Sequence, residues 1–157
     1  MVILGIDPGT NRAGYGLVKK DQGNLSLLDY GCVEIKSKSD HNAGLLTLHD
    51  EFSKIIKKWK PEVLAIEKIF FFKNAKTISQ VSEAIGVIIL SGLRSGLKIK
   101  EFTPLQVKQA VSAYGKADKK AVQKMVRLIL SLKEDPQPDD AADALAVAIC
   151  SANTRDF

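Results

Sequence analysis

The chain has 157 residues, of which 45% are apolar and 26% charged, so its size and composition predict one globular domain over residues 1–157. No apolar run reaches the roughly 20 residues of a membrane span, and no basic segment precedes the apolar residues 1–6. We therefore expect a strand there and not a signal peptide, in a cytoplasmic protein; the net charge of +5 is too moderate to diagnose nucleic-acid binding.

The first half of the chain predicts four strands and one helix. A polar loop with Gly23 separates two of the strands, which is typical of a hairpin, and Pro61 ends the helix. The strands are expected at residues 2–7, 13–19, 25–36 and 63–67, and the helix, from apolar residues at helical spacing, at 43–59.

The second half predicts further helices around one more strand. Helices are expected at residues 77–93, 105–113 and 119–132, with a strand at 97–102. After a proline-containing turn, Asp139 or Asp140 begins the last helix, because aspartate is favoured at the N-cap and in the first turn. The order of these elements predicts an α/β fold in which helices cover a mixed five-stranded sheet.

Four acidic residues are placed where metal-assisted chemistry would need them. Asp7 and Glu67 each follow an apolar strand, and the carboxyl ends of neighbouring parallel strands meet at one edge of a sheet. Asp140 and Asp143 are three positions apart and share a face at a helix start. Carboxylates in apolar surroundings need partners, and the chain offers no obvious buried arginine for each of them. Divalent cations would do so, which points to metal-assisted cleavage of a phosphodiester.

Each acid also has an ordinary structural interpretation, which singly is at least as good. The alternatives are a turn at Asp7, surface pairing of Glu67 with Lys68 or Lys73, N-caps at Asp139 and Asp140, and a solvated Asp143. Two acids at strand ends together with an acidic pair at helical spacing are harder to dismiss jointly, so we favour the metal site.

Lysines and aromatic residues near these acids suggest contact with nucleic acid. Lysines surround the Glu67 segment and a glycine-containing loop, where we expect them to follow phosphates: Lys68, Lys73, Lys76, Lys116, Lys119, Lys120 and Lys124. Three consecutive aromatics, Phe70–Phe72, cannot all face one core, so one of them stacks on a base or all pack in a core or dimer interface. Gly14 and Gly16 only loosely resemble a phosphate-binding loop, and we assign them to strand-to-strand packing.

Five stretches in the same order resemble the RuvC family of Holliday junction resolvases. They are GIDPGTNRAGYG (5–16), AIEKIFFFKNA (65–75), PLQVKQAV (104–111), GKADKKAVQKMV (115–126) and PQPDDAADALAVAI (136–149). The resemblance implies a ribonuclease H-like fold with helices on both faces of the sheet. It also implies a homodimer that makes paired, symmetric nicks in four-way DNA junctions during recombination and repair, leaving 5′-phosphate and 3′-hydroxyl ends.

The resemblance also implies roles for single residues. The acids Asp7, Glu67, Asp140 and Asp143 would be catalytic and hold two Mg²⁺ ions, with Mn²⁺ as an alternative, whereas Asp139 is an additional acid without a catalytic role. The expected DNA contacts are Phe70, Lys73, Asn74, Lys108, Lys119 and Lys120. The helix near 77–93, with its small residues, would form the dimer, and the RuvA and RuvB branch-migration proteins would be partners.

Other classes of function share some of these features. Actin-like and sugar-kinase ATPases also begin with a GIDxGT-like phosphate loop, which residues 5–10 fit, but they need two lobes and a second loop. A module that binds structured nucleic acid without cutting would not need all four acids. An RNA-processing relative with the same fold stays open, because the sugar of the substrate leaves no mark on the sequence.

Overall fold

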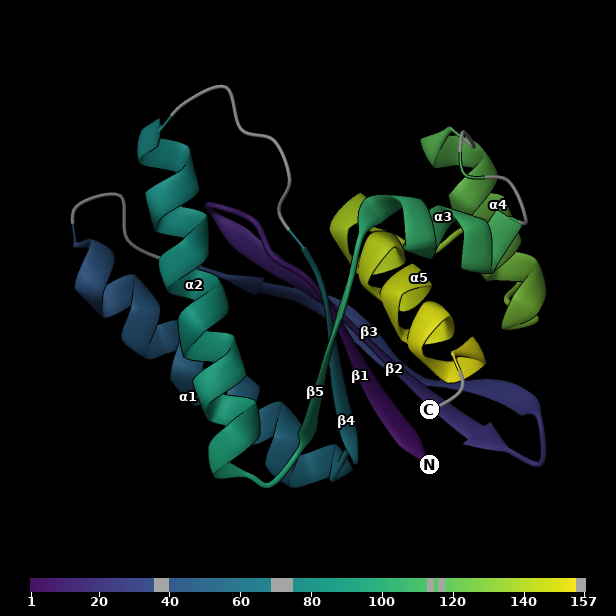
Figure 1. The fold of residues 1–157 in the computed structure, drawn as a ribbon, viewed down its shortest axis with the longest axis horizontal. Helices are drawn as coiled ribbons and strands as arrows, with labels where there is room; N and C mark the ends of the chain where they lie inside the picture. Colours follow the sequence, from purple (N-terminus) through teal and green to yellow (C-terminus); the bar gives the residue numbers. More distant parts are fainter. Residues whose placement is uncertain (36–39, 69–74, 113–114, 116–117, 155–157) are drawn as a thin grey trace.

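The computed structural model describes residues 1–35, 40–68, 75–112, 115 and 118–154 (Figure 1). The predicted DNA contacts Phe70, Lys73 and Asn74 lie outside these described residues, as does Lys116. Among the described helices, none is long and apolar enough to cross a membrane.

A mixed five-stranded sheet forms the centre of the fold, in the order β3-β2-β1-β4-β5. The first three strands pair antiparallel, and the last two run parallel to β1. Their bounds are β1 (Val2–Asp7), β2 (Arg12–Asp21), β3 (Asn24–Glu34), β4 (Val63–Glu67) and β5 (Lys98–Phe102). The predicted strands, the hairpin and the mixed sheet are therefore confirmed.

Helices cover both faces of the sheet, as Figure 1 shows. On one face lie α1 (His41–Trp59) and α2 (Ala75–Arg94), which close a core with the β1 residues Leu4 and Ile6. On the other lie α3 (Pro104–Ser112), α4 (Lys119–Ile129) and α5 (Asp139–Asn153), which close a second core with Ile3. This alternation of buried strand residues follows from the two-residue period of a strand, which sends successive side chains to opposite faces.

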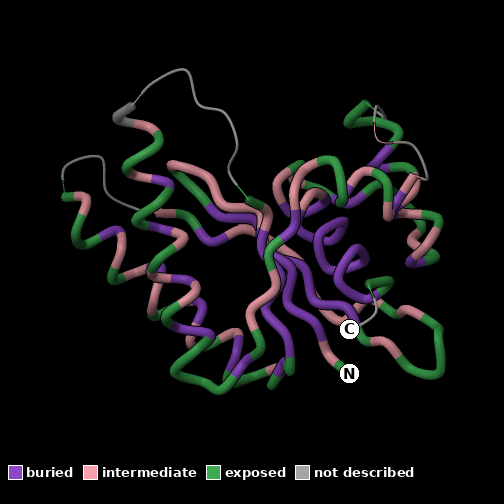
Figure 2. The backbone as a smooth tube through the Cα atoms, in the orientation of Figure 1, coloured by how far each residue is buried: buried purple, intermediate pink, exposed green. Residues whose placement is uncertain are grey.

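The last helix, α5, is the most deeply buried helix of the fold (Figure 2). Its N-cap is Pro138, without a side-chain cap bond, so neither Asp139 nor Asp140 caps the helix as one of our alternatives had it. Both lie in its first turn, where the helix dipole favours negative charge. This turn faces the carboxyl end of β1, which brings a segment of the C-terminal part of the chain beside Asp7.

Glycines in β1 and β2 let α5 approach the sheet closely. A Cβ at Gly14 would lie 2.0 Å from the carbonyl oxygen of Asp140, and one at Gly5 would lie 2.2 Å from that of Ala144. Gly14 is also the register partner of Asp7 across the β1–β2 pair. A Cβ at Gly16 would likewise lie 2.8 Å from the backbone nitrogen of Leu145 on α5. Our assignment of Gly14 and Gly16 to strand-to-strand packing is therefore wrong, because it is α5 that occupies the space their side chains would need.

Candidate active site

Two predicted site residues lie at the ends of adjacent parallel strands. Ile6 of β1 is the register partner of Ile66 of β4, so Asp7 and Glu67 follow in equivalent places at the carboxyl edge. The four strand residues directly before each of them are buried, and this apolar setting holds both carboxyls in partly buried positions. β1 and β4 are adjacent and parallel, so the condition under which these two strand ends meet at one edge is fulfilled.

Of the four predicted acids, Asp7 lies within the electrostatic field of the other three, Glu67, Asp140 and Asp143. Burial first, and then the negative charges of Asp143, Glu67 and Asp140 in that order, together raise the pKa of Asp7 to about 8. Burial and then the charge of Asp143 raise the pKa of Glu67 to about 7. Residues from three segments thus share a concentration of negative charge that opposes their simultaneous ionisation.

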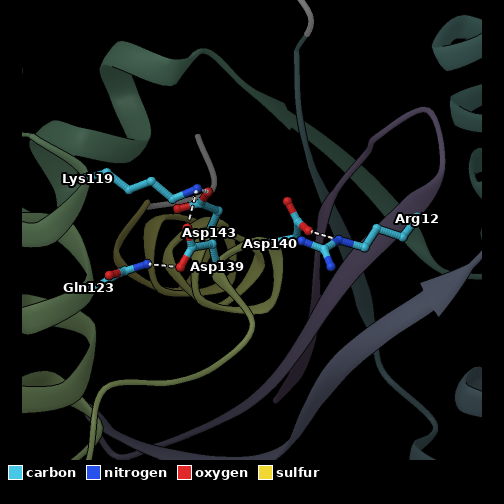
Figure 3. Close-up of polar contacts among 6 residues, drawn as sticks. All are labelled: Arg12, Lys119, Gln123, Asp139, Asp140 and Asp143. Atoms are coloured by element: carbon cyan, nitrogen blue, oxygen red, sulfur yellow. Dashed lines mark hydrogen bonds and ion pairs between the residues drawn. The ribbon is translucent and has the colours of Figure 1, made fainter.

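Two cationic side chains hold acids of α5 (Figure 3). The Arg12 Nε donates a hydrogen bond to Oδ2 of Asp140, and the Lys119 ammonium lies 3.1 Å from Oδ2 of Asp143. Arg12 is exposed, so the prediction that no buried arginine neutralises these acids is not contradicted, but Asp140 does have an arginine partner at the surface. Within the described parts of the chain, no group of three or more His, Cys, Asp or Glu side chains is arranged to hold a metal ion.

The proposed surface pairing of Glu67 with Lys68 is not what the structure shows, because the Lys68 ammonium lies 3.6 Å from Glu101 on β5. The positive charge of Lys108 instead acts on Glu67 and opposes the rise of its pKa, whose largest cause is burial. Glu67 is thus placed toward the helical layer of α3 and α5 and not toward its neighbour in sequence.

A cavity of about 210 Å³ lies beside two of the four acids. It contains Glu67 and Asp143 together with the predicted DNA-contact residues Lys108 and Lys119, and its apolar wall comes from α3, α4 and α5: Pro104, Val107, Val122 and Ala146. Lys120 lies exposed in the first turn of α4. The structure therefore brings two anions and two cations to one opening at the carboxyl edge of the sheet.

Sequence reasoning missed Arg12 and Gln123. Arg12 and Asp140 are 128 positions apart, so no local spacing could have connected them. Gln123 is buried on α4, and its Nε2 donates to Oδ1 of Asp139 at 2.8 Å. The sequence pattern could have revealed Gln123, because it lies between Val122 and Val126 on the buried face of an amphipathic helix. A buried amide requires a hydrogen-bond partner, so this position predicts a polar contact.

By their chemistry, though not by the present arrangement of side chains in the described parts of the chain, the donors at this edge suit a divalent cation of the hard type. All four are carboxylates, which are the ligands that Mg²⁺ and Mn²⁺ prefer. The raised pKa of Asp7, from burial and three neighbouring acids, shows that the side chains present leave negative charge uncompensated there. A divalent ion would lower these pKa values and replace Arg12 and Lys119 as the partner of Asp140 and Asp143.

The mixed five-stranded sheet with helical layers on both faces defines a ribonuclease H-like fold, and the acids at its carboxyl edge are residue types that a metal-dependent nuclease of this class uses. The chain belongs to the RuvC family, because the family model "Crossover junction endodeoxyribonuclease RuvC" matches residues 3–151. It is 49% identical to the RuvC of Halothermothrix orenii over 98% of this chain and 93% of that protein, and 47% identical to that of Fusobacterium nucleatum over 98% and 81%.

Solved structures agree with this assignment. The structure described as T. thermophilus RuvC in complex with Holliday junction substrate superimposes with a TM-score of 0.90 and 34% identity, over 96% of this chain and 92% of that one. The yeast mitochondrial Holliday junction resolvase Ydc2 shares the fold, with a TM-score of 0.69 at 15% identity. These findings favour a nuclease over the actin-like ATPase alternative, and the chain is a crossover junction endodeoxyribonuclease by family.

Proposed function

We propose that this protein resolves four-way DNA junctions as a homodimer, by paired symmetric nicks that leave 5′-phosphate and 3′-hydroxyl ends, in recombination and repair. The observation that carries the proposal is the clustering of Asp143, Glu67 and Asp140 around Asp7, whose pKa is raised to about 8 by burial and then by these three charges. The T. thermophilus relative, which is described in complex with a Holliday junction, supports the choice of substrate.

In this proposal the four acids hold two Mg²⁺ ions, for which Mn²⁺ can substitute. When bound, such ions supply an activated water and stabilise the leaving oxygen of an in-line displacement. The side chains of the protein bind and orient the substrate. Lys108 and Lys119 at the cavity attract the phosphate of the DNA, and the paired ends of β1 and β4 orient Asp7 and Glu67 toward that phosphate. Phe70, Lys73, Asn74 and Lys120 are proposed as further DNA contacts.

The homodimer is proposed to form through α2. This helix exposes apolar and small residues at helical spacing: Ile78, Ser82, Gly86, Leu90 and Leu93. A two-fold axis would relate two copies of the active site, as symmetric nicking of two strands of like polarity requires. The proposed setting is the cytoplasm, the proposed unit is one nuclease domain over residues 1–157, and RuvA and RuvB are the proposed protein partners.

Metal removal tests the proposed reaction. The protein should nick a synthetic four-way junction at two symmetric positions in Mg²⁺ and should lose at least about a thousandfold of this rate in EDTA, because the ions supply the attacking water. A linear duplex of the same sequence serves as the control substrate. Cleavage of both substrates alike, or cleavage that persists in EDTA, contradicts the proposal. The 5′-phosphate ends are read by ligation of the resolved arms.

Leu90→Lys tests the dimer. The side chain of Leu90 is 54% exposed on α2, and a buried lysine at a two-fold interface would bring two like charges together. We expect a shift to monomer in analytical ultracentrifugation and a loss of coordinated double nicking. Apart from the stabilisation that dimerisation itself supplies, the free energy of unfolding should change by less than about 1 kcal/mol. Leu128→Lys is the matched control, because Leu128 is 56% exposed but lies on α4. A dimer retained by Leu90→Lys at wild-type affinity argues against this interface.

A further inference from the structure

Two pairs of residues form a polar clasp between α4 and α5 at the proposed metal site, as Figure 3 shows. Lys119 and Gln123 of α4 are four positions apart, as are Asp139 and Asp143 of α5, so each pair presents one face of its helix to the other. We propose that Asp139 is a positioning residue: fixed by the amide of Gln123, it shares Lys119 with Asp143 and so sets how readily Asp143 accepts a divalent cation.

The fixed part of the clasp is the bond between Gln123 and Asp139. Gln123 is only 8% exposed, and its Nε2 donates to Oδ1 of Asp139 at 2.8 Å. Breaking this bond would leave a buried amide without its partner, which costs free energy. The contact between Gln123 and Asp139 is therefore expected to stay formed. Oδ1 of Asp139 is thereby directed at α4, and its second oxygen is left for Lys119.

The movable part is the ammonium of Lys119. It lies 3.1 Å from Oδ2 of Asp143 and 3.4 Å from Oδ2 of Asp139, and its side chain is 50% exposed. A cation that arrives at Asp143 repels this ammonium, which must give up its bond there. Asp139 offers an anion that Lys119 already contacts, so the ammonium can leave Asp143 and still remain paired beside the cavity.

The same contacts argue against a direct ligand role for Asp139. Its two carboxylate oxygens contact Gln123 and Lys119 of α4, as Figure 3 shows, whereas Asp143 lines the cavity that also contains Glu67. A positioning role and a ligand role make different predictions once Lys119 is removed. If Asp139 acts through Lys119, its substitution loses most of its effect in a protein that lacks the ammonium.

A double-mutant cycle on Mn²⁺ binding to the DNA-free protein tests this, with free Mn²⁺ followed by electron paramagnetic resonance. Lys119→Gln should bind Mn²⁺ more tightly than the wild type, because it removes the competing ammonium. Asp139→Asn should weaken binding about fivefold, since Lys119 then rests on Asp143 alone, but by less than about twofold in the Lys119→Gln background. Equal weakening in both backgrounds overturns the proposal and makes Asp139 a ligand or a source of negative field.

Two further variants control for charge and folding. Glu134→Gln removes an exposed negative charge from the segment before α5 and should leave Mn²⁺ affinity within about twofold of wild type. Gln123→Met keeps all charges but releases Asp139, and should weaken Mn²⁺ binding in the wild type and not in Lys119→Gln. An unchanged affinity in Gln123→Met overturns the role of the amide.

This inference rests on the proposed function, but the two fail differently. If neither the wild type nor Lys119→Gln binds Mn²⁺ saturably, the metal site of the proposed function is itself contradicted, and the positioning role falls with it. If the wild type and Lys119→Gln both bind Mn²⁺, but Asp139→Asn does not change Mn²⁺ affinity or changes it equally in both backgrounds, only the positioning role is overturned. Thermal unfolding of each variant confirms that a folded protein is compared.

Discussion

Asp7→Asn should abolish junction nicking while the protein still binds the junction. The asparagine keeps the shape of the side chain but removes a negative charge and a strong metal ligand, so we expect a loss of at least about a thousandfold in the nicking rate. Binding should persist, because the lysines that attract phosphate, Lys108 and Lys119, are untouched. Gel-shift titration and single-turnover cleavage of the same junction measure the two effects separately.

The same substitution should stabilise the metal-free protein. Burial, with the charges of Asp143, Glu67 and Asp140, raises the pKa of Asp7 from 3.8 to about 8 in the folded state. Between these values the folded protein holds a proton that the unfolded chain has lost, so the free energy of unfolding falls as pH rises from about 4 to about 8. No such loss exists at lower pH, where both states are protonated.

Asp7→Asn removes this pH dependence and should raise the free energy of unfolding at pH 8 by about 1–4 kcal/mol. Thermal unfolding in EDTA at several pH values measures it, with Asp50→Asn, an exposed acid of α1, as the control. Mg²⁺ should stabilise the wild type and much less the variant. Retained nicking by Asp7→Asn contradicts the catalytic role of Asp7. A difference in the free energy of unfolding between Asp7→Asn and the metal-free wild type that does not grow from pH 5 to pH 8 contradicts its raised pKa.

The sequence was sufficient to predict the strands and which of them carry the acids. A buried parallel strand is a short apolar run, and Val63–Glu67 was located to the residue for that reason. The placement of Asp7 and Glu67 followed, because carboxyl ends of parallel neighbours share an edge. Helix ends shifted by one to three residues, as for α4, which ends at Ile129 and not at residue 132.

Side-chain partners could not be predicted in the same way. The pairing of Arg12 with Asp140 depends on where α5 crosses the sheet, which neither segment encodes alone. The clasp of Gln123 with Asp139 likewise depends on how α4 packs on α5. A local pattern states which residues share a face of an element, whereas the partner of that face is a property of the assembled fold.

Glycine was the residue most easily misassigned. In β2, Gly14 and Gly16 alternate with Ala13, Tyr15 and Leu17, a pattern that fits a loop, a bulge or a close approach equally well. Only the folded arrangement distinguishes these, since it places the backbone of Asp140 against Gly14. The alanine-rich sequence of α5 was the complementary signal, because two surfaces of small residues allow a helix to lie near a sheet.

Gly14→Ala should therefore damage both stability and catalysis. Its Cβ would meet the carbonyl oxygen of Asp140 at 2.0 Å, so the first turn of α5 must move by about 1 Å or more. Overpacking of this kind costs about 1–3 kcal/mol of unfolding free energy, and a displacement of about 1 Å at the acids costs about a hundredfold in nicking rate.

Gly23→Ala separates these two effects. Gly23 has a φ of +90° in the β2–β3 hairpin and nothing within 4 Å of its Cβ position, so alanine there strains only the backbone. It should cost about 1 kcal/mol of stability and leave nicking unchanged below the melting temperature. Nicking rates of the two variants are compared at a temperature where both are folded. If Gly14→Ala is as active as Gly23→Ala there, then the close approach of α5 to the sheet does not set the positions of Asp140 and Asp143.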